Sequence, residues 1–296
     1  MNSNQPKSIQ SVAIFYNCQK PHAEGGAQYT QSFLREKGLH LFYHKLGEEN
    51  AFFADTKQTI LASLQQSDLV IVFGGDGTIL GIAREMGAYP KPIMGVHVGR
   101  FGFLTSTTMQ ELDTALHNLI HGNYRAFERH LLEAWVTNHE TETFRSFALN
   151  EALVTMSFPG RVLDIILDIN DTPELAYRGD GLIIATPTGS TGHSLSAGGP
   201  ILEPSLAALV ITPLSPHSLF NRPLVVEGKK ELCIHFREGT KSPELILDGQ
   251  IYHKLNPTDR IYIQRSQTTI QTIVFGEHSF TNNLRQKFNL GQRIHE

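Results

Sequence analysis

The sequence predicts an α/β domain followed by an all-β domain: an N-terminal, doubly wound domain built on a parallel sheet, and then a C-terminal domain like a β-sandwich. Three observations predict this. The 296 residues suffice for two domains of ordinary size. In roughly the first 125 residues, apolar strand-like runs alternate with helix-like stretches, which is typical of parallel βαβ units. From about residue 129 onward, short strand-like runs follow one another with few helices between them.

We therefore expect residues 1–125 to form the α/β domain and residues 126–275 the β-rich domain. Residues 276–296 are expected to form a polar tail with a short final helix that packs back on the first domain.

In the first half, strands are expected at residues 11–16, 39–43, 68–73 and 92–98. Helices are expected near residues 28–37, around Ile60 and Leu64, and at residues 112–120, where the leucines fall on one face. Open parallel sheets bind their ligands at the carboxyl ends of the strands. The residues that follow positions 73 and 98 are therefore candidates for a site.

In the second half, the apolar runs predict strands at residues 131–136, 144–155, 162–169, 181–185, 206–212, 224–226, 231–236, 244–247 and 260–263. The single tryptophan, Trp135, stands in one of these runs and is expected in the core.

Composition excludes several classes of protein. A formal net charge of -4 gives no overall field that would gather nucleic acid or anionic lipid, so neither nucleic acid nor membrane is expected as a partner. Cys18 and Cys233 are far apart and belong to no CxxC pair, which favours a reducing compartment over a disulfide framework. Because no 18 apolar residues run together and the first ten are polar, we expect a cytoplasmic protein.

The motif GGDGT at residues 74–78 carries the first functional signal. Its glycines let a ligand approach the backbone, and the amides that open the following helix favour a phosphate. Asp76 would repel that phosphate unless it faces a hydroxyl, a ribose or a metal ion, so a chemical role is indicated. The motif is not a Walker loop, and Leu80 stands where the dinucleotide fingerprint needs a glycine. The alternative is a tight turn with Asp76 as N-cap.

A second motif lies in the β-rich half, where residues 178–201 combine a strand with a turn rich in glycine and hydroxyl groups. Such a turn suits the recognition of a sugar, a base edge or phosphate oxygens, and Asp180 can accept hydrogen bonds from ribose or amide donors. Two surfaces of this kind in two domains predict a nucleotide cleft. The pair Ser190 and His193 does not fit GxSxG, and no third partner is identifiable, so hydrolase chemistry is not expected.

Four motifs in order resemble the NAD kinases: GGDGT at 74–78, Asn150-Glu151, the segment 186–200 from TPTGST to SAGGP, and Asp248-Gly249. GGDG alone is also similar to the diacylglycerol and sphingosine lipid kinases and, loosely, to the 6-phosphofructokinases. The three later motifs favour the NAD kinases over both.

The resemblance implies that ATP phosphorylates the 2′-hydroxyl of the adenosine ribose of NAD, giving NADP, with a divalent ion such as Mg²⁺ held on the ATP phosphates rather than by the protein. It implies that Asp76 is the catalytic base. It further implies a homodimer or homotetramer. The cofactor-binding residues that it implies are Gly75, Asp76, Gly77, Thr78, Asn150, Glu151, Arg161, Arg178, Asp180, Thr191, Gly192, His193, Ser194, Leu195, Ser196 and Gln250.

Two departures from the family pattern are visible. Gly192-His193 stands where the family usually has Ala-Tyr, and residues 99–102 read Gly-Arg-Phe-Gly instead of the usual Gly-Asn/His-Leu-Gly. We expect altered affinity or donor preference rather than loss of activity. Two alternatives stay open at this point: a lipid kinase, and a dinucleotide sensor that has lost transfer.

Overall fold

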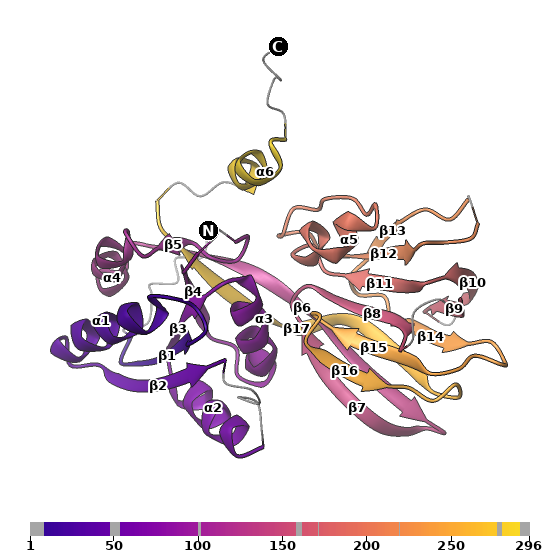
Figure 1. Ribbon diagram of the computed structural model, residues 1–296, viewed down its shortest axis with the longest axis horizontal. Coiled ribbons are helices and arrows are strands. Elements are labelled where there is room, and N and C mark those ends of the chain that lie inside the picture. Colours follow the sequence, from indigo (N-terminus) through magenta and orange to yellow (C-terminus); the bar gives the residue numbers. More distant parts are fainter. Residues whose placement is uncertain are drawn as a thin grey trace, which may run out of the picture. The chain divides into compact units, whose positions relative to one another are not determined.

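The computed structural model describes residues 9–47, 54–99, 102–157, 162–170, 172–218, 220–276 and 280–290. The chain forms two compact units (Figure 1). The first contains Met1–Ile82, Tyr89–Phe127 and Gln271–Glu296, and the second contains Ala83–Ala88 and Glu128–Ile270. The predicted domain limits at residues 125 and 275 stay a prediction.

A parallel sheet forms the centre of the first unit. Its strands lie in the order β2 (His40–Leu46), β1 (Ser11–Asn17), β3 (Leu69–Gly74) and β4 (Pro92–His97). The end of β17 (Arg260–Val274) and the short β5 (Thr107–Thr108) also pair with β4 in the parallel sense. Because all these strands run in one direction, the carboxyl ends of β1, β3 and β4 meet at one edge.

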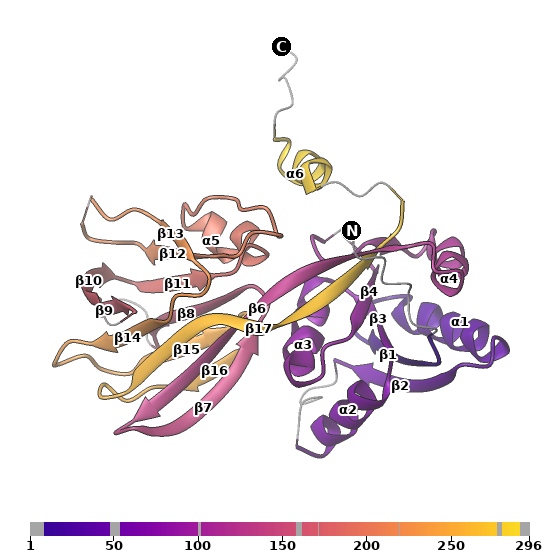
Figure 2. The ribbon, with the colours of Figure 1, turned by 180° about the vertical axis from the view of Figure 1, so that it is seen from behind.

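Helices cover both faces of this sheet (Figures 1 and 2). Val12, Ile14 and Tyr16 point to one face, where they share a core with α1 (Ala23–Glu36) and α4 (Leu112–Ile120). Ala13 and Phe15 on the other face are also fully buried. The first unit also contains α2 (Ala54–Gln66), most of α3 (Asp76–Glu85, whose last residues fall in the second unit) and α6 (Phe280–Phe288). A 3-10 turn at Met86–Ala88 follows α3 and belongs to the second unit.

The second unit is mostly antiparallel. One sheet has the order β13 (Leu224–Glu227), β12 (Ala208–Leu214), β11 (Gly181–Ala185), β8 (Glu151–Met156), β15 (Pro243–Leu247) and β16 (Ile251–Lys254). The other contains β10 (Thr172–Gly179), β9 (Leu163–Ile169), β14 (Leu232–Phe236) and β17, with β6 (Arg125–Asn138) and β7 (Thr141–Ala148) alongside. Alternate side chains of both sheets share one apolar core. The predicted fold class is confirmed.

Several strand predictions are wrong in detail. Residues 144–155 form two strands rather than one, because the chain bends at Leu149 and Asn150, whose amides bind the Asp248 carboxylate instead of a neighbouring strand. Strands β10 and β16 were not predicted. β10 is an edge strand, which explains how it tolerates Pro173. Strands β6 and β17 are longer than predicted, at 14 and 15 residues.

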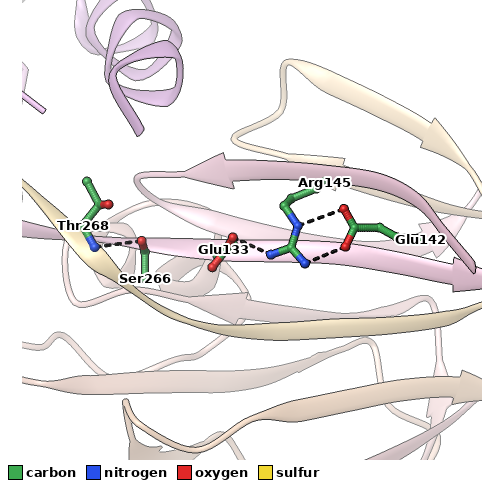
Figure 3. A network of polar contacts seen from close by, with 5 residues as sticks. All are labelled: Glu133, Glu142, Arg145, Ser266 and Thr268. Carbon is green, nitrogen blue, oxygen red and sulfur yellow. Dashed lines mark hydrogen bonds and ion pairs between the residues drawn. The ribbon is translucent and has the colours of Figure 1, made fainter. Parts of the chain in front are cut away.

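The prediction that Trp135 lies in the core is also wrong. Its neighbours Ala134 and Val136 point inward, so Trp135 lies half-buried on the outer face, stacked on Tyr262 at 5.3 Å between ring centres. The Arg145 guanidinium covers that ring at 4.9 Å and pairs with Glu133 and Glu142 at 2.6 Å each (Figure 3). Because Arg145 and Glu142 are exposed, the network contributes little stability.

None of the helices in the described ranges combines the length and the apolar character that crossing a membrane would need.

Candidate active site

The GGDGT loop joins β3 directly to α3. The Gly75 carbonyl accepts the amides of Thr78 at 3.0 Å and Ile79 at 3.3 Å, so α3 begins within the motif. A Cβ on Gly74 would overlap the Thr78 side chain, which requires glycine there. A Cβ on Gly75 would meet nothing within 4 Å, and Gly77 is exposed. The loop therefore leaves its backbone open beside Gly75, as a phosphate would need.

The half-buried Asp76 carboxylate is held by two backbone amides from the loop after β4. Phe103 donates to Oδ2 at 2.7 Å and Leu104 to Oδ1 at 3.1 Å. A Cβ on Gly102 would overlap this carboxylate, so any other residue there would displace the Asp76 side chain. Each carboxylate oxygen keeps capacity for a further hydrogen bond. The amides thus fix the orientation of Asp76, which simple N-capping of α3 would not require.

The end of β1 also reaches this loop. Asn17 donates through Nδ2 to Thr78 Oγ1 at 3.4 Å and accepts the Gln19 amide at 3.0 Å. Asn17 was not predicted as a site residue, since an asparagine after a strand is common in turns.

In the second unit, the bend at Asn150 and Glu151 is built around Asp248. This carboxylate accepts the amides of Leu149, Asn150 and Glu151 at 2.9, 2.8 and 3.1 Å. Asp248 and Gly249 have φ of 50° and 64°, so both adopt the left-handed conformation that an Asp-Gly hairpin turn favours. The tight turn places a buried carboxylate under three consecutive amides and thereby shapes the bend.

Two polar atoms at this bend are buried and have no hydrogen-bond partner among the described residues: Asn150 Oδ1 and Glu151 Oε2. Glu151 is only 8% exposed. Its burial, and next the nearby Asp248 charge, raise the pKa of Glu151 to about 8. Burial also raises the pKa of Asp248, whereas its three amide donors and Arg84 oppose that rise. Asp248 is thus the better stabilised carboxylate of the pair, and Glu151 holds the proton near neutral pH.

The segment 186–200 packs against the same bend. The Thr186 amide donates to the Asn150 carbonyl at 2.8 Å, and its hydroxyl donates to Leu149 O at 2.6 Å. A Cβ on Gly189 would overlap the Asn150 backbone. A Cβ on Gly192 would lie 3.4 Å from Glu151 Oε2 and 3.5 Å from Asn150 Nδ2. Gly192 therefore borders both unpaired side chains.

The other predicted residues of this segment take different positions. His193 and Ser196 are exposed, and Leu195 is half-buried. The Thr191 hydroxyl donates to Thr188 O at 3.2 Å, while Ser194 is fully buried with its hydroxyl 2.8 Å from that of Thr212. Ser194 thus packs the segment onto β12 rather than facing outward.

Gln250 follows the Asp248-Gly249 turn and accepts from the buried Arg84 at 3.1 Å. Arg84 lies on α3 and was not predicted, because a single arginine at the end of a helix usually faces solvent. Arg161 lies outside the described residues.

Arg178 and Asp180 are not brought together with the bend. They directly precede β11, whose first residue, Gly181, pairs with Thr155. Glu151 lies at the opposite end of β11, where it pairs with the last residue, Ala185. The five residues of β11 separate the two groups by roughly 16 Å. Arg178 is exposed and lies 3.8 Å from Asp164 rather than beside Asp180.

Among the described residues, no three His, Cys, Asp or Glu side chains gather as a metal site.

Comparison with known proteins identifies the family. Residues 12–124 match the model of the ATP-NAD kinase N-terminal domain, and residues 149–275 match that of the ATP-NAD kinase C-terminal domain. The NAD kinase of Geobacter sulfurreducens is 33% identical over 291 residues, spanning 96% of this chain and 100% of the relative. That of Geotalea daltonii is 35% identical with the same coverage.

Solved structures share the fold. Yeast NADH kinase, solved in complex with NADH, superposes with a TM-score of 0.85 at 20% identity, covering 98% of this chain and 91% of that one. An NAD kinase from Archaeoglobus fulgidus, solved with ATP, gives a TM-score of 0.69 at 23% identity and covers 94% and 98%. Family models and curated relatives agree along nearly the whole chain, which therefore belongs to the NAD kinase family.

Proposed function

We propose that Asp76 is the catalytic base of the reaction that this chain performs as an NAD kinase, the transfer of the terminal phosphate of ATP to the 2′-hydroxyl of the adenosine ribose of NAD. The observation that carries the proposal is the carboxylate fixed by the Phe103 and Leu104 amides beside an open glycine loop. As the ribose oxygen bonds to the γ-phosphorus, the bond between the γ-phosphorus and the bridging oxygen of ADP breaks. The hydroxyl proton passes to Asp76.

Phosphoryl transfer depends on positioning and on charge neutralisation more than on covalent help. Gly75, Gly77 and Thr78 would present the loop backbone to phosphate oxygens. We propose that a divalent ion, Mg²⁺, arrives on the ATP phosphates, which supply the oxygen ligands that it prefers.

The dinucleotide is proposed to bind at the bend of the second unit. Within the described part of the chain, Asn150 Oδ1 and Glu151 Oε2 are buried without a hydrogen-bond partner, and such atoms ordinarily find a donor. A hydroxyl or an amino group of the adenosine would supply one. Gly192 borders this position, and its missing Cβ leaves more room than the alanine usual in the family. Thr191 and His193 flank Gly192 in the sequence and are proposed to line the same ligand.

The proposal is tested by incubating the pure protein with NAD or NADH and a panel of donors: ATP, other nucleoside triphosphates and polyphosphate. Formation of NADP or NADPH supports it. Phosphorylation of diacylglycerol or sphingosine in vesicles would instead support a lipid kinase, and tight NAD binding without turnover under any donor would support a sensor.

Gly102→Ala is expected to lower kcat by about 10²-fold, because the new Cβ would displace the Asp76 carboxylate, and small misplacements of a reacting group have effects of that size. Steady-state kinetics of NADP formation measure the change. Gly25→Ala in α1 is the matched control, since a Cβ there meets nothing within 4 Å. Unchanged kcat in the Gly102 variant would contradict the proposed constraint on Asp76.

We further propose a cytoplasmic homodimer or homotetramer. Both cysteines are free, which suits a reducing compartment. Arg178 and Asp180 lie at the far end of β11 from Glu151, and a ligand cannot run along β11 because all five of its residues are buried. If these two residues bind the same dinucleotide as Glu151, a second copy of the chain must supply them.

Subunit mixing tests this arrangement. Asp76→Asn and Asp180→Asn should each be impaired alone, yet co-refolding them in equal amounts should rebuild about a quarter of the sites with both aspartates if dimers form at random. NADP formation measures the recovery, and light scattering measures the oligomeric state. A mixture no more active than its components would place both aspartates in one subunit.

A further inference from the structure

Helix α6 packs against the loop that holds Asp76. The ammonium Nζ of Lys287 lies 3.7 Å from the centre of the Phe103 ring, and the Phe288 ring lies 5.3 Å from it. Phe103 is also the residue whose amide donates to Asp76 Oδ2 at 2.7 Å. Leu284 of the same helix is buried. Phe103 thus connects the C-terminal helix to the carboxylate.

Lys287 is a half-buried cation. Burial lowers the pKa of Lys287 to about 8, and the charge of Asp76 opposes this shift. The Asp76 carboxylate is therefore near enough to stabilise the ammonium form, which predominates at neutral pH. Because the Lys287 ammonium lies over the Phe103 ring, the cation–π contact holds the charged end of the side chain in a defined place.

The proposed reaction needs such a charge. A nucleoside triphosphate brings several negative charges towards the GGDGT loop, which already carries the carboxylate of Asp76. The loop lacks the lysine that neutralises phosphates in a Walker loop. Arg178 stands on β10 near Asp164 and belongs to the other unit.

We infer that Lys287 is a binding residue for the polyphosphate chain of the donor, placed by α6 and Phe103 beside the Asp76 carboxylate. The inference rests on the proposed role of Asp76. Binding of the phosphates would draw the ammonium group from carboxylate to donor, which leaves Asp76 available to the ribose hydroxyl. Lys287 takes part in no covalent step; its charge stabilises the negative oxygens of the transferring group.

Three variants test the inference. Lys287→Met keeps an unbranched apolar side chain at this position and removes the charge. Lys287→Arg keeps the unbranched side chain and the charge. Arg285→Met removes a charge from an exposed position of the same helix and is the matched control.

The expected result is a kcat/KM for ATP that is about 10- to 100-fold lower in Lys287→Met, the loss typical of one hydrogen bond to a charged group. The Kd of Mg·ATP measured by calorimetry without NAD should rise, its salt dependence should weaken, and the KM for NAD should stay within about twofold. Lys287→Arg should recover most of the loss, and the control should behave like the parent.

Unchanged Mg·ATP affinity in a folded Lys287→Met protein would overturn the inference while leaving the role of Asp76 intact. An equal loss in Lys287→Arg and Lys287→Met would also overturn it, because packing rather than charge would then matter. If the parent protein formed no NADP at all, this result would contradict the proposed function itself, independently of Lys287. Thermal unfolding of each variant verifies that α6 has not simply detached.

Discussion

Asp76→Asn is expected to lower kcat by about 10²- to 10⁴-fold, the range over which general bases act. The carboxamide is a poor proton acceptor. It also places an N–H₂ group where the carboxylate accepted a backbone amide, so either the Phe103 or the Leu104 bond is lost. Single-turnover formation of NADP measures the chemical step without interference from product release.

The NAD affinity of Asp76→Asn, measured by calorimetry, should stay near that of the parent protein, because Asp76 contacts only the 2′-hydroxyl, to which a carboxamide can still hydrogen-bond, and the other proposed dinucleotide contacts lie on the second unit. A variant that turns over within a few-fold of the parent rate would exclude Asp76 as the base. A large loss of NAD affinity would show instead that Asp76 mainly contributes to the binding of NAD before the reaction.

Glu151→Gln is expected to stabilise the fold at alkaline pH. The pKa of Glu151 is raised from 4.5 to about 8 in the folded protein, so folding takes up a proton between these values. The stability of the parent should therefore fall as pH rises through this window, and the full penalty, on the order of 5 kcal/mol, should be present only above pH 8. Glutamine resembles the neutral acid and avoids the penalty.

Denaturant unfolding at pH 5, 7 and 9 measures this difference, which should be small at pH 5 and largest at pH 9. Glu238→Gln, the same change at an exposed loop position, should show little dependence on pH. Glu151→Gln should also bind NAD more weakly, because the unpaired Oε2 is the proposed ligand contact. A stability gain that does not grow with pH would contradict a protonated Glu151.

The parts of the fold that could be predicted depend on local signals. The β3–α3 junction follows from a continuous apolar run that ends in glycines, and the antiparallel half follows from short runs between turn residues. These signals act within a few residues, where sequence spacing and spatial distance agree.

The remaining features are long-range and carry no residue-type signal. The groups that orient Asp76 are backbone amides 27 and 28 residues away, and any residue has an amide. Asp248 reaches amides 97 to 99 residues away. Conversely, Arg178 and Asp180 are close in sequence to the 186–200 segment, but β11 lies between them as an extended strand and separates them from it in space.

In the proposed reaction, the Asp76 carboxylate meets the ribose hydroxyl that is phosphorylated. A crystal structure of the protein with bound NAD would show this contact. We expect an Asp76 carboxylate oxygen about 2.6–3.2 Å from the adenosine 2′-oxygen, with the Phe103 and Leu104 amides still bound to the carboxylate. An NAD molecule whose 2′-oxygen faces another side chain, with Asp76 directed away from the ribose, would contradict it.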